Sequence, residues 1–276
     1  MCVNPSSGGS GGDGGSGGST GGSGAGGEGA AGGEGGTAGS GASGVCSPNE
    51  DGTITRDEVP LEPGLDAKFR IATNVTFSTA GTMDAGDTTW DLSTTLAGDH
   101  ATLIETLPLP GTWFADVFPG ASYAARLTDT ETLLGVFEIT EDALLLRGIV
   151  SPEGGVTRTE LTYEPPVEVL SFPLVQGKTW STDANITGVT SGVFSVYTET
   201  YDSVVDKRGT IITPFSTFDG FRVRVDLTRT VGALVTTQKT FAFVTECFGN
   251  VATINSELNE TSAEFTQVSE IRRLTP

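Results

Sequence analysis

The stretch from residue 47 to residue 58 has the residue types and spacing of a calcium-binding loop. Gly52 is taken as the sixth position, where glycine permits a sharp turn, and the twelfth position then holds a glutamate that can bind through both oxygens. The candidate ligands are Asn49, Asp51, the main-chain carbonyl of Thr53, and Glu58. Calcium takes about six to eight hard oxygen ligands, which these groups supply in part. The spacing therefore predicts one Ca²⁺ site.

This segment resembles an EF-hand loop, with clear departures from that pattern. Ser47 stands at the first position, where the family has an aspartate, and Pro48 and Pro60 occupy the places of the flanking helices. The missing carboxylate removes one ligand charge, which weakens affinity toward the range of extracellular calcium modules. The alternative interpretation is an acidic turn that leads into the first strand.

The first of the three cysteines, Cys2, heads a Gly/Ser-rich tract that extends to residue 45 and holds 21 of the 39 glycines. Such a tract lacks the apolar side chains needed to fold, so we expect a disordered tether. The arrangement resembles a mature bacterial lipoprotein, in which a lipidated cysteine carries a polar tether, with Met1 in place of the signal peptide. Val3 in place of an aspartate favours the outer membrane. If Met1 is the native start, Cys2 has no such role.

The remaining cysteines, Cys46 and Cys247, form an even pair. A bond between them would close a loop of about 200 residues, which the chain-entropy treatment values at up to about 5 kcal/mol. Disulfides belong to oxidising compartments, so the pair also favours export. Two unpaired thiols are the alternative. A zinc site is excluded because the chain offers too few clustered ligands.

Charge excludes one large class of partners. The formal net charge is −20, and residues 1–45 contribute only Asp13, Glu28 and Glu34, so residues 46–276 carry −17. Such a surface repels phosphate backbones, which argues against nucleic-acid binding. The sequence also has no apolar run of the roughly 18 residues that a transmembrane helix needs.

No catalytic constellation emerges from the sequence. G-x-S-x-G and G-x-G-x-x-G patterns occur only in the Gly/Ser tract, where no strand or helix can position them. His100 is the single histidine and falls in a turn before a strand. Trp90, Trp113 and Trp180 suit core or rim packing better than sugar stacking. The sequence therefore predicts a protein that is not an enzyme.

Strand patterns dominate from Asp66 onward. Apolar and polar residues alternate over residues 69–77 and 221–228, and residues 193–205 and 241–247 add further strands. We expect an all-β domain, either an antiparallel sandwich or a strongly curved half-barrel. The predicted organisation is a tether at 1–45, an acidic EF-hand-like segment at 46–63 and the β-domain at 64–276. The Pro165-Pro166 step is a candidate boundary between two halves of that domain.

Several phrases of the sequence together resemble a family of exported β-domains found in bacterial surface lipoproteins and in secreted proteins with sorting tails. The phrases are residues 86–93 (GDTTWDLS), 168–180 (EVLSFPLVQGKTW), 206–214 (DKRGTIITP) and 218–223 (FDGFRV). The similarity spans roughly residues 66–258. It implies a structural role for these motifs and carries over no reaction and no catalytic residue.

Three functions follow as hypotheses. The first is a non-enzymatic, membrane-anchored lipoprotein at the outer membrane or cell surface, acting as a binding or structural module for a protein or carbohydrate ligand of unspecified kind. The second is a carrier that holds an acyl chain in a curved sheet. The third is a polysaccharide hydrolase, which would need two carboxylates roughly 5–10 Å apart beside an exposed tryptophan.

Overall fold

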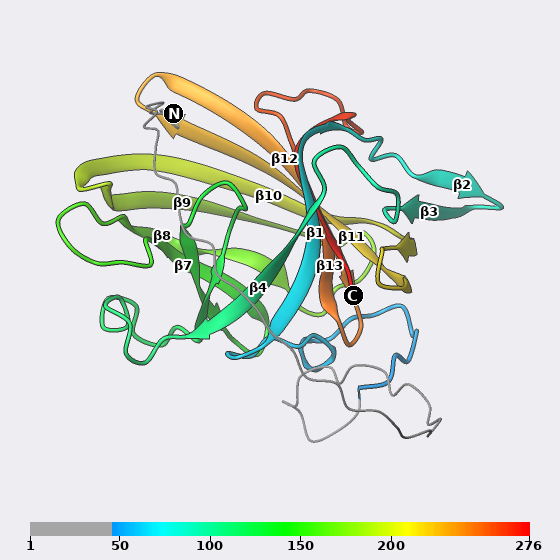
Figure 1. Cartoon of the computed structure of the whole chain (residues 1–276), viewed down its shortest axis with the longest axis horizontal. Coiled ribbons are helices and arrows are strands. Elements are labelled where there is room, and N and C mark those ends of the chain that lie inside the picture. The colour runs from blue at the N-terminus through cyan, green and yellow to red at the C-terminus, as the bar shows by residue number, and fades with distance from the viewer. Residues whose placement is uncertain (1–45) are drawn as a thin grey trace, which may run out of the picture. The chain divides into compact units, whose positions relative to one another are not determined.

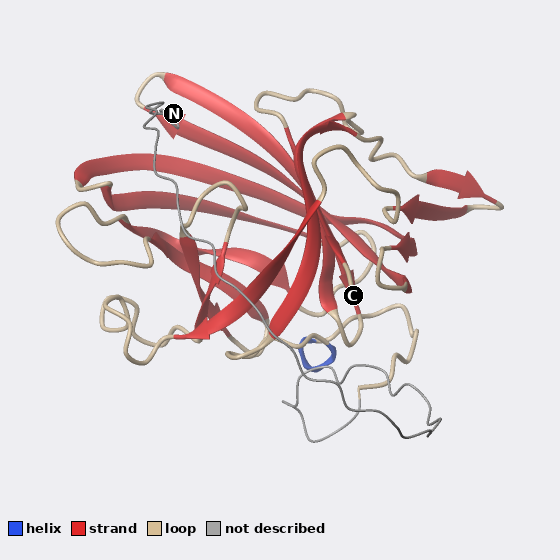
Figure 2. Ribbon diagram, viewed as in Figure 1, coloured by secondary structure: helices blue, strands red, loops and turns tan. Residues whose placement is uncertain are grey.

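The computed structural model describes residues 46–276, whose regular structure is β-strand apart from one 3₁₀ turn (Figure 1; Figure 2). This part of the chain contains fourteen strands and one 3₁₀ turn, η1 (Arg56–Glu58). The strands are β1 (Asp66–Thr76), β2 (Thr82–Asp84), β3 (Asp87–Asp91), β4 (His100–Pro108), β5 (Tyr123–Arg126), β6 (Leu134–Ile139), β7 (Ala143–Val150), β8 (Glu160–Ser171), β9 (Thr179–Thr190), β10 (Val193–Ile212), β11 (Thr217–Val231), β12 (Leu234–Thr245), β13 (Gly249–Ser256) and β14 (Gln267–Leu274). The predicted all-β fold is confirmed. No helix within residues 46–276 has the length and apolarity to cross a membrane. The predicted tether and its Cys2 lie outside the described residues.

Twelve of the described strands form a closed antiparallel barrel. Their order is β11-β12-β13-β14-β1-β4-β5-β6-β7-β8-β9-β10, and β10 pairs back with β11 along most of its length. The sheet is thus curved so strongly that its two edges meet. Closure leaves the long strands of the ring without a free edge over most of their length, and unpaired edges are the usual route to edge-to-edge aggregation.

The short β2–β3 hairpin lies outside this ring and continues it at one edge. β3 runs parallel to β10, with Thr88 opposite Gly209 and Trp90 opposite Ile211. β9 pairs with this edge of β10 only as far as Val204, and β3 pairs with the same edge from Gly209 onward. Gly209 makes the approach possible, because a Cβ there would lie 2.1 Å from the carbonyl oxygen of Thr88.

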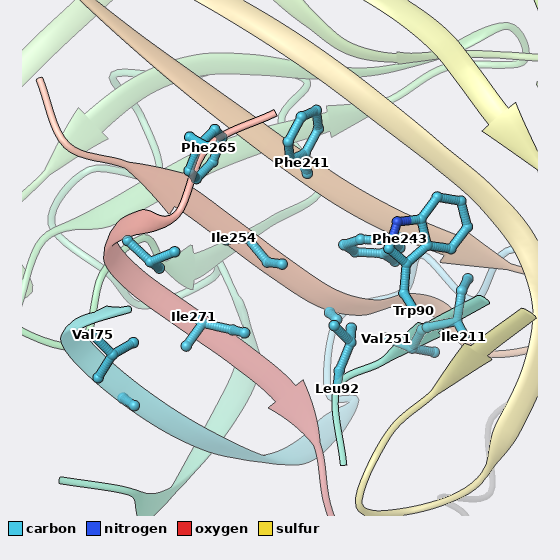
Figure 3. Packing of buried hydrophobic residues seen from close by; sticks show 13 residues of the cluster. Val75, Trp90, Leu92, Ile211, Phe241, Phe243, Val251, Ile254, Phe265 and Ile271 are labelled. Carbon is cyan, nitrogen blue, oxygen red and sulfur yellow. The ribbon is translucent and has the colours of Figure 1, made fainter. Parts of the chain in front are cut away.

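An apolar cluster covers the outer face of β12, β13 and β14 (Figure 3). Trp90 packs edge-on against Phe243 with ring centroids 5.3 Å apart, and Phe265 stacks on Phe241 at the same distance. Arg222 is 1 % exposed within this layer and lies 4.0 Å above the Phe241 ring. Its charge is balanced by carboxylates of residues 206 and 264, at 2.6 and 2.7 Å. The outer cluster therefore buries a cation only together with its counter-charges, as burial requires.

A second cluster fills the barrel interior. It joins buried residues from opposite sides of the ring, namely Tyr123, Leu144, Leu170, Phe172, Leu174, Val205, Phe221, Val223 and Val244, and it includes Ile54 and Val59 from the segment before β1. The two clusters lie on opposite faces of β12. Phe243 belongs to the outer cluster, and the next residue, Val244, belongs to the interior one. The segment 46–63 thus contributes apolar side chains to the core of the β-domain.

Two local expectations need correction. The alternation predicted over residues 69–77 changes phase at Asn74, whose φ of 52° places Ala72 and Val75 in the same cluster although they are three residues apart. The Pro165-Pro166 step lies inside β8 and separates no halves. It falls in the stretch where the pairing of β7 with β8 is irregular, which accommodates residues that cannot donate a ladder hydrogen bond.

Candidate functional site

A disulfide fixes the start of the described chain to the end of β12. Cys46 and Cys247 are bonded, with Cα atoms 5.5 Å apart and 201 positions between them in sequence, so the predicted pairing is confirmed. Cys247 lies in the turn between β12 and β13, and its N–H donates to the carbonyl of Glu58 at 2.7 Å. The disulfide and this hydrogen bond hold both ends of the segment 46–58 against the same turn.

The middle of that segment is anchored in the barrel. Ile54 exchanges two main-chain hydrogen bonds with Leu174, at 3.0 and 2.8 Å, and both side chains are buried. Val59 is buried in the same interior cluster. Because apolar side chains on both sides of η1 enter the core, the polar residues 47–53 are left as an arch across one end of the barrel.

The predicted calcium ligands lie within this arch and make hydrogen bonds to their own loop. Asn49 Oδ1 accepts the N–H of Asp51 at 2.9 Å, and Asp51 Oδ1 accepts the N–H of Thr53 at 2.8 Å. Asn49 Nδ2 donates to Glu58 Oε1 at 2.7 Å. Glu58 Oε2 accepts from the N–H and the hydroxyl of Thr55, both at 2.7 Å, which forms a capping box for η1. The structure brings Asn49 and Glu58 together, with an amide N–H between them.

This geometry fits the acidic-turn interpretation, and the calcium site stays a prediction. Over residues 46–276, no three His, Cys, Asp or Glu side chains are grouped to hold a metal ion. For an ion to bind, the amide of Asn49 would have to turn its oxygen toward Glu58 and give up the present hydrogen bond. The loop would also lose part of its capping box, because Glu58 holds η1 through the same carboxylate.

A cavity of about 230 Å³ lies beneath the arch. Buried side chains of Ile54, Phe221 and Thr245 line it, so its apolar part continues into the interior cluster. Gly52 forms part of the arch and has φ of +86°, and a Cβ there would lie 3.1 Å from Nη1 of Arg208. The arch therefore passes close to β10 at a position that favours glycine.

Four charged side chains line the cavity, and three of them are acidic: Glu50, Asp219 and Glu246 against Arg208. Arg208 forms a bidentate pair with Asp219, at 2.8 and 3.1 Å, and hydrogen bonding to this carboxylate raises the pKa of Arg208. Glu246 Oε2 accepts the N–H of Asn49 at 2.6 Å, which ties the arch to the end of β12. One guanidinium against three carboxylates gives the lining a formal charge of −2.

Aromatic rings form another wall of the cavity. Phe218 and Phe248 line it, with ring centroids 5.0 Å apart in an edge-on arrangement. Phe215 stacks beside Phe218, with centroids 6.4 Å apart. Phe215 and Phe248 are 46 % and 43 % exposed, which is high for phenylalanine in a β-protein. The acidic lining thus adjoins an aromatic surface that solvent reaches.

Thr245 supplies an unused hydrogen-bonding group at this cavity. Its side chain is 1 % exposed, and its hydroxyl has no hydrogen-bond partner within residues 46–276. A buried hydroxyl without a partner costs roughly 1–3 kcal/mol. The residue lines the cavity, where a ligand could satisfy that hydroxyl.

Sequence reasoning found the arch of this site but missed its walls. The wall residues Arg208, Phe218 and Asp219 lie in two phrases that the family resemblance identified as structural, 206–214 and 218–223. Their meeting depends on the pairing of β10 with β11, which places Arg208 opposite Phe221 and Thr210 opposite Asp219. The local signal in the sequence was the pair of acidic residues, Glu50 and Asp51, just before the turn at Gly52, and such a pair alone does not indicate a cavity.

The residues considered for catalysis lie elsewhere and make structural contacts. His100 Nε2 lies 2.7 Å from Asp129, and its Nδ1 lies 3.1 Å from the carbonyl of Gly98. The indole of Trp90 is buried and donates to a main-chain carbonyl, as do the indoles of Trp113 and Trp180. These contacts fit the packing roles that the sequence favoured for the tryptophans.

A buried carboxylate inside the barrel pairs with the half-buried Arg229. The carboxylate of Glu199 is fully buried, and Arg229 Nε and the Tyr201 hydroxyl both donate to it at 2.5 Å. Burial raises the pKa of Tyr201 well above its usual value. All three groups have partners, so the cluster holds β10 to β11 and leaves little capacity for a ligand.

Comparisons of the chain with protein-family models, with curated proteins and with solved structures give no significant match. Its function must therefore be argued from its own geometry. Of the described sites, the cavity beneath the disulfide-bonded arch combines open volume, unbalanced charge, exposed aromatic rings and an unsatisfied hydroxyl.

Proposed function

We propose that the chain is a non-enzymatic binding module, held at the outer membrane or cell surface by a lipid on Cys2. The observation that carries the binding role is the cavity beneath the arch, which is bounded by the disulfide-linked segment and by β10, β11 and β12. A cavity framed by paired strands and by a disulfide-bonded segment suits the capture of a ligand, because little ordering entropy is lost when the ligand binds.

The location of the protein outside the cytoplasm is supported by the disulfide. Such bonds persist in oxidising compartments and are rare where thiols are kept reduced. The anchor is supported by the position of Cys2 at the head of the Gly/Ser-rich segment, which resembles a mature lipoprotein. Stable anchoring takes more than one acyl chain, and multiple acylation of a single cysteine supplies this.

The interior of the barrel gives the second hypothesis, an acyl-chain carrier, no comparable support. Side chains of the interior cluster and of a neighbouring cluster around Tyr163 and Ile186 occupy the space between the strands. The fully buried Glu199 places a charge in that interior, where an acyl chain would desolvate it further. We therefore place the ligand in the cavity beneath the arch.

The binding role is tested by screening the full chain against a panel of small amines, sugars, amino acids and organic acids. The readout is the set of ¹⁵N–¹H NMR signals of Gly52, Gly220 and Thr245, which line the cavity. Thr217→Trp puts a large ring at the exposed border of the cavity and is expected to abolish the shifts. Thr198→Trp, an exposed position on β10 that does not line the cavity, is the matched control. A panel in which no compound moves these signals contradicts the assignment of the site.

The anchor is tested separately by detergent-phase partitioning of the chain produced in a bacterial host behind a lipoprotein signal peptide. The protein is expected in the detergent phase, and the Cys2→Ser variant in the aqueous phase. If both partition into water, the anchor is wrong while the ligand site is unaffected.

A further inference from the structure

We infer that the cavity beneath the arch recognises an alkylammonium group, such as the end of a lysine side chain or of a small primary amine. This inference rests on the proposed function and narrows it to one class of ligand. It follows from three features of the lining: the charge, the aromatic wall and the unsatisfied hydroxyl of Thr245.

The charge of the lining selects a cation. Arg208 is already engaged by both oxygens of Asp219, so its positive charge is offset within the site. Glu50 and Glu246 interact with Arg208 only through longer-range attraction, and together they leave the lining with a net negative charge. The carboxylate of Glu50 makes no hydrogen bond or ion pair to any described residue, and Glu246 uses one oxygen to hold the arch. An anion entering this cavity would meet net repulsion, whereas a cation would be attracted.

The aromatic wall favours an organic cation over a bare metal ion. Phe218 and Phe248 line the cavity in an edge-on pair, and an ammonium group placed over a ring face would be attracted while the rings cover its alkyl stem. A hard metal ion requires converging oxygen ligands, and the acidic side chains of residues 46–276 are not grouped in that way. The pairing of carboxylates with phenyl rings fits a group that is charged at one end and apolar along its stem.

The Thr245 hydroxyl adds an acceptor on the buried side of the cavity. It has no partner among the described residues, and its neighbours in the lining are the apolar side chains of Ile54 and Phe221. An ammonium group carries three N–H donors and no acceptor. The lining carboxylates can accept from such donors, and the Thr245 hydroxyl could accept another once the lining shifts to uncover it, because its oxygen is shielded from solvent in the structure.

The test compares three probes of the same length that differ in their end group: n-butylammonium, n-butanol and butyrate. Each is titrated into the full chain while the amide signals of Gly52, Gly220 and Thr245 are followed. We expect butylammonium to bind about five- to tenfold more tightly than butanol, and butyrate to cause no shift, because the net negative charge of the lining attracts the cation and repels the carboxylate.

Substitutions of lining residues test whether these residues cause the preference for butylammonium. Glu50→Gln and Glu246→Gln are each expected to raise the Kd for butylammonium about three- to fivefold. Gln keeps an oxygen that can accept the Asn49 N–H, so the arch is retained. Phe248→Leu is expected to raise it about two- to fivefold through loss of the ring face. Glu257→Gln removes an exposed carboxylate at the other end of β13 and is the matched control, with no expected effect.

The outcomes separate this inference from the proposed function. Equal affinity for butanol or butyrate overturns the cation preference and leaves a binding site at the cavity. Equal effects of Glu246→Gln and Glu257→Gln also overturn it, since the attraction would then be general. If none of the three probes shifts the cavity signals, the inference fails. The blocked peptide N-acetyl-Gly-Lys-Gly-amide, whose only ammonium is that of the lysine, identifies the source: binding comparable to that of butylammonium indicates a lysine side chain, and its absence indicates a free amine.

Discussion

Removing the disulfide is the perturbation whose size follows most directly from the structure. The double variant Cys46→Ala/Cys247→Ala deletes one bond and little packing, because Cys46 is exposed and Cys247 is half-buried. The arch keeps its other attachments, including both hydrogen bonds between Ile54 and Leu174. We therefore expect the variant to fold with the barrel intact, so that its loss of stability comes mainly from the unfolded chain.

The magnitude depends on the length of the loop that the bond closes. Cross-linking residues that are 201 positions apart removes chain entropy worth about 5 kcal/mol at 25 °C in the loop-closure treatment. Measured losses for native disulfides are commonly somewhat smaller, so we expect the free energy of unfolding to fall by about 3–5 kcal/mol. The denaturant dependence should become steeper, because an unfolded chain without the cross-link exposes more surface.

The assay is equilibrium urea unfolding followed by fluorescence of the three tryptophans. Both proteins carry Cys2→Ala, so that no free thiol can form a new cross-link during unfolding. A loss below about 1 kcal/mol with an unchanged urea slope would contradict the loop-entropy reasoning. A loss far above 5 kcal/mol would show that the bond also holds the folded arch in place.

Three further predictions concern the barrel. Glu199→Ala removes the acceptor of the half-buried Arg229 and of the Tyr201 hydroxyl and should lower the free energy of unfolding by about 1–3 kcal/mol, measured by urea titration. The carbonyl of Gly98 and the carboxylate of Asp129 raise the pKa of His100, so its charged form stabilises the fold below about pH 6.5 and this contribution disappears as the pH rises through the raised pKa. The chain has one histidine, so a single ring signal in NMR should titrate with a midpoint above about 6.5, and a lower midpoint would contradict the structure. Gly209→Ala places a methyl carbon 2.1 Å from a carbonyl oxygen of β3 and should cost about 1–3 kcal/mol, with the fluorescence of the β3 indole changed; an unchanged spectrum would show that β3 adapts.

The strands were predictable because their signals are local. Alternation and the frequency of Val, Thr and Phe located part of each of β10, β11 and β12, with ends that differ by up to seven residues, since each residue type responds to a half-buried extended backbone. The phase change at Asn74 was not visible, because a single left-handed residue reverses the faces without altering the composition. The cysteine pair was accessible for a different reason: two residues that can bond only with each other leave a single choice.

The closure of the sheet and the walls of the cavity could not be predicted from local sequence patterns. The sheet closes because two pairs of strands meet. β10 pairs with β11 in two segments separated by a register shift, and β1 pairs with β14, which lies near the other end of the described sequence. The wall of the cavity joins Arg208, Phe218 and Thr245 from three strands, which no spacing in the sequence relates. In the loop at 47–58, the residues with calcium-like spacing form a capping box and two turns closed by side-chain oxygens in the structure.

Because β14 pairs with both β1 and β13, the ring cannot be completed until Gln267–Leu274 has been synthesised. Thr73 meets Glu270 across this seam, and synthesis at about 5–20 residues per second separates the two by roughly 10–40 s. During that interval β1 has an unpaired edge that can pair with another chain. A stop codon before residue 267 would leave the barrel permanently open, even though the arch, the disulfide and the cavity residues had all been made.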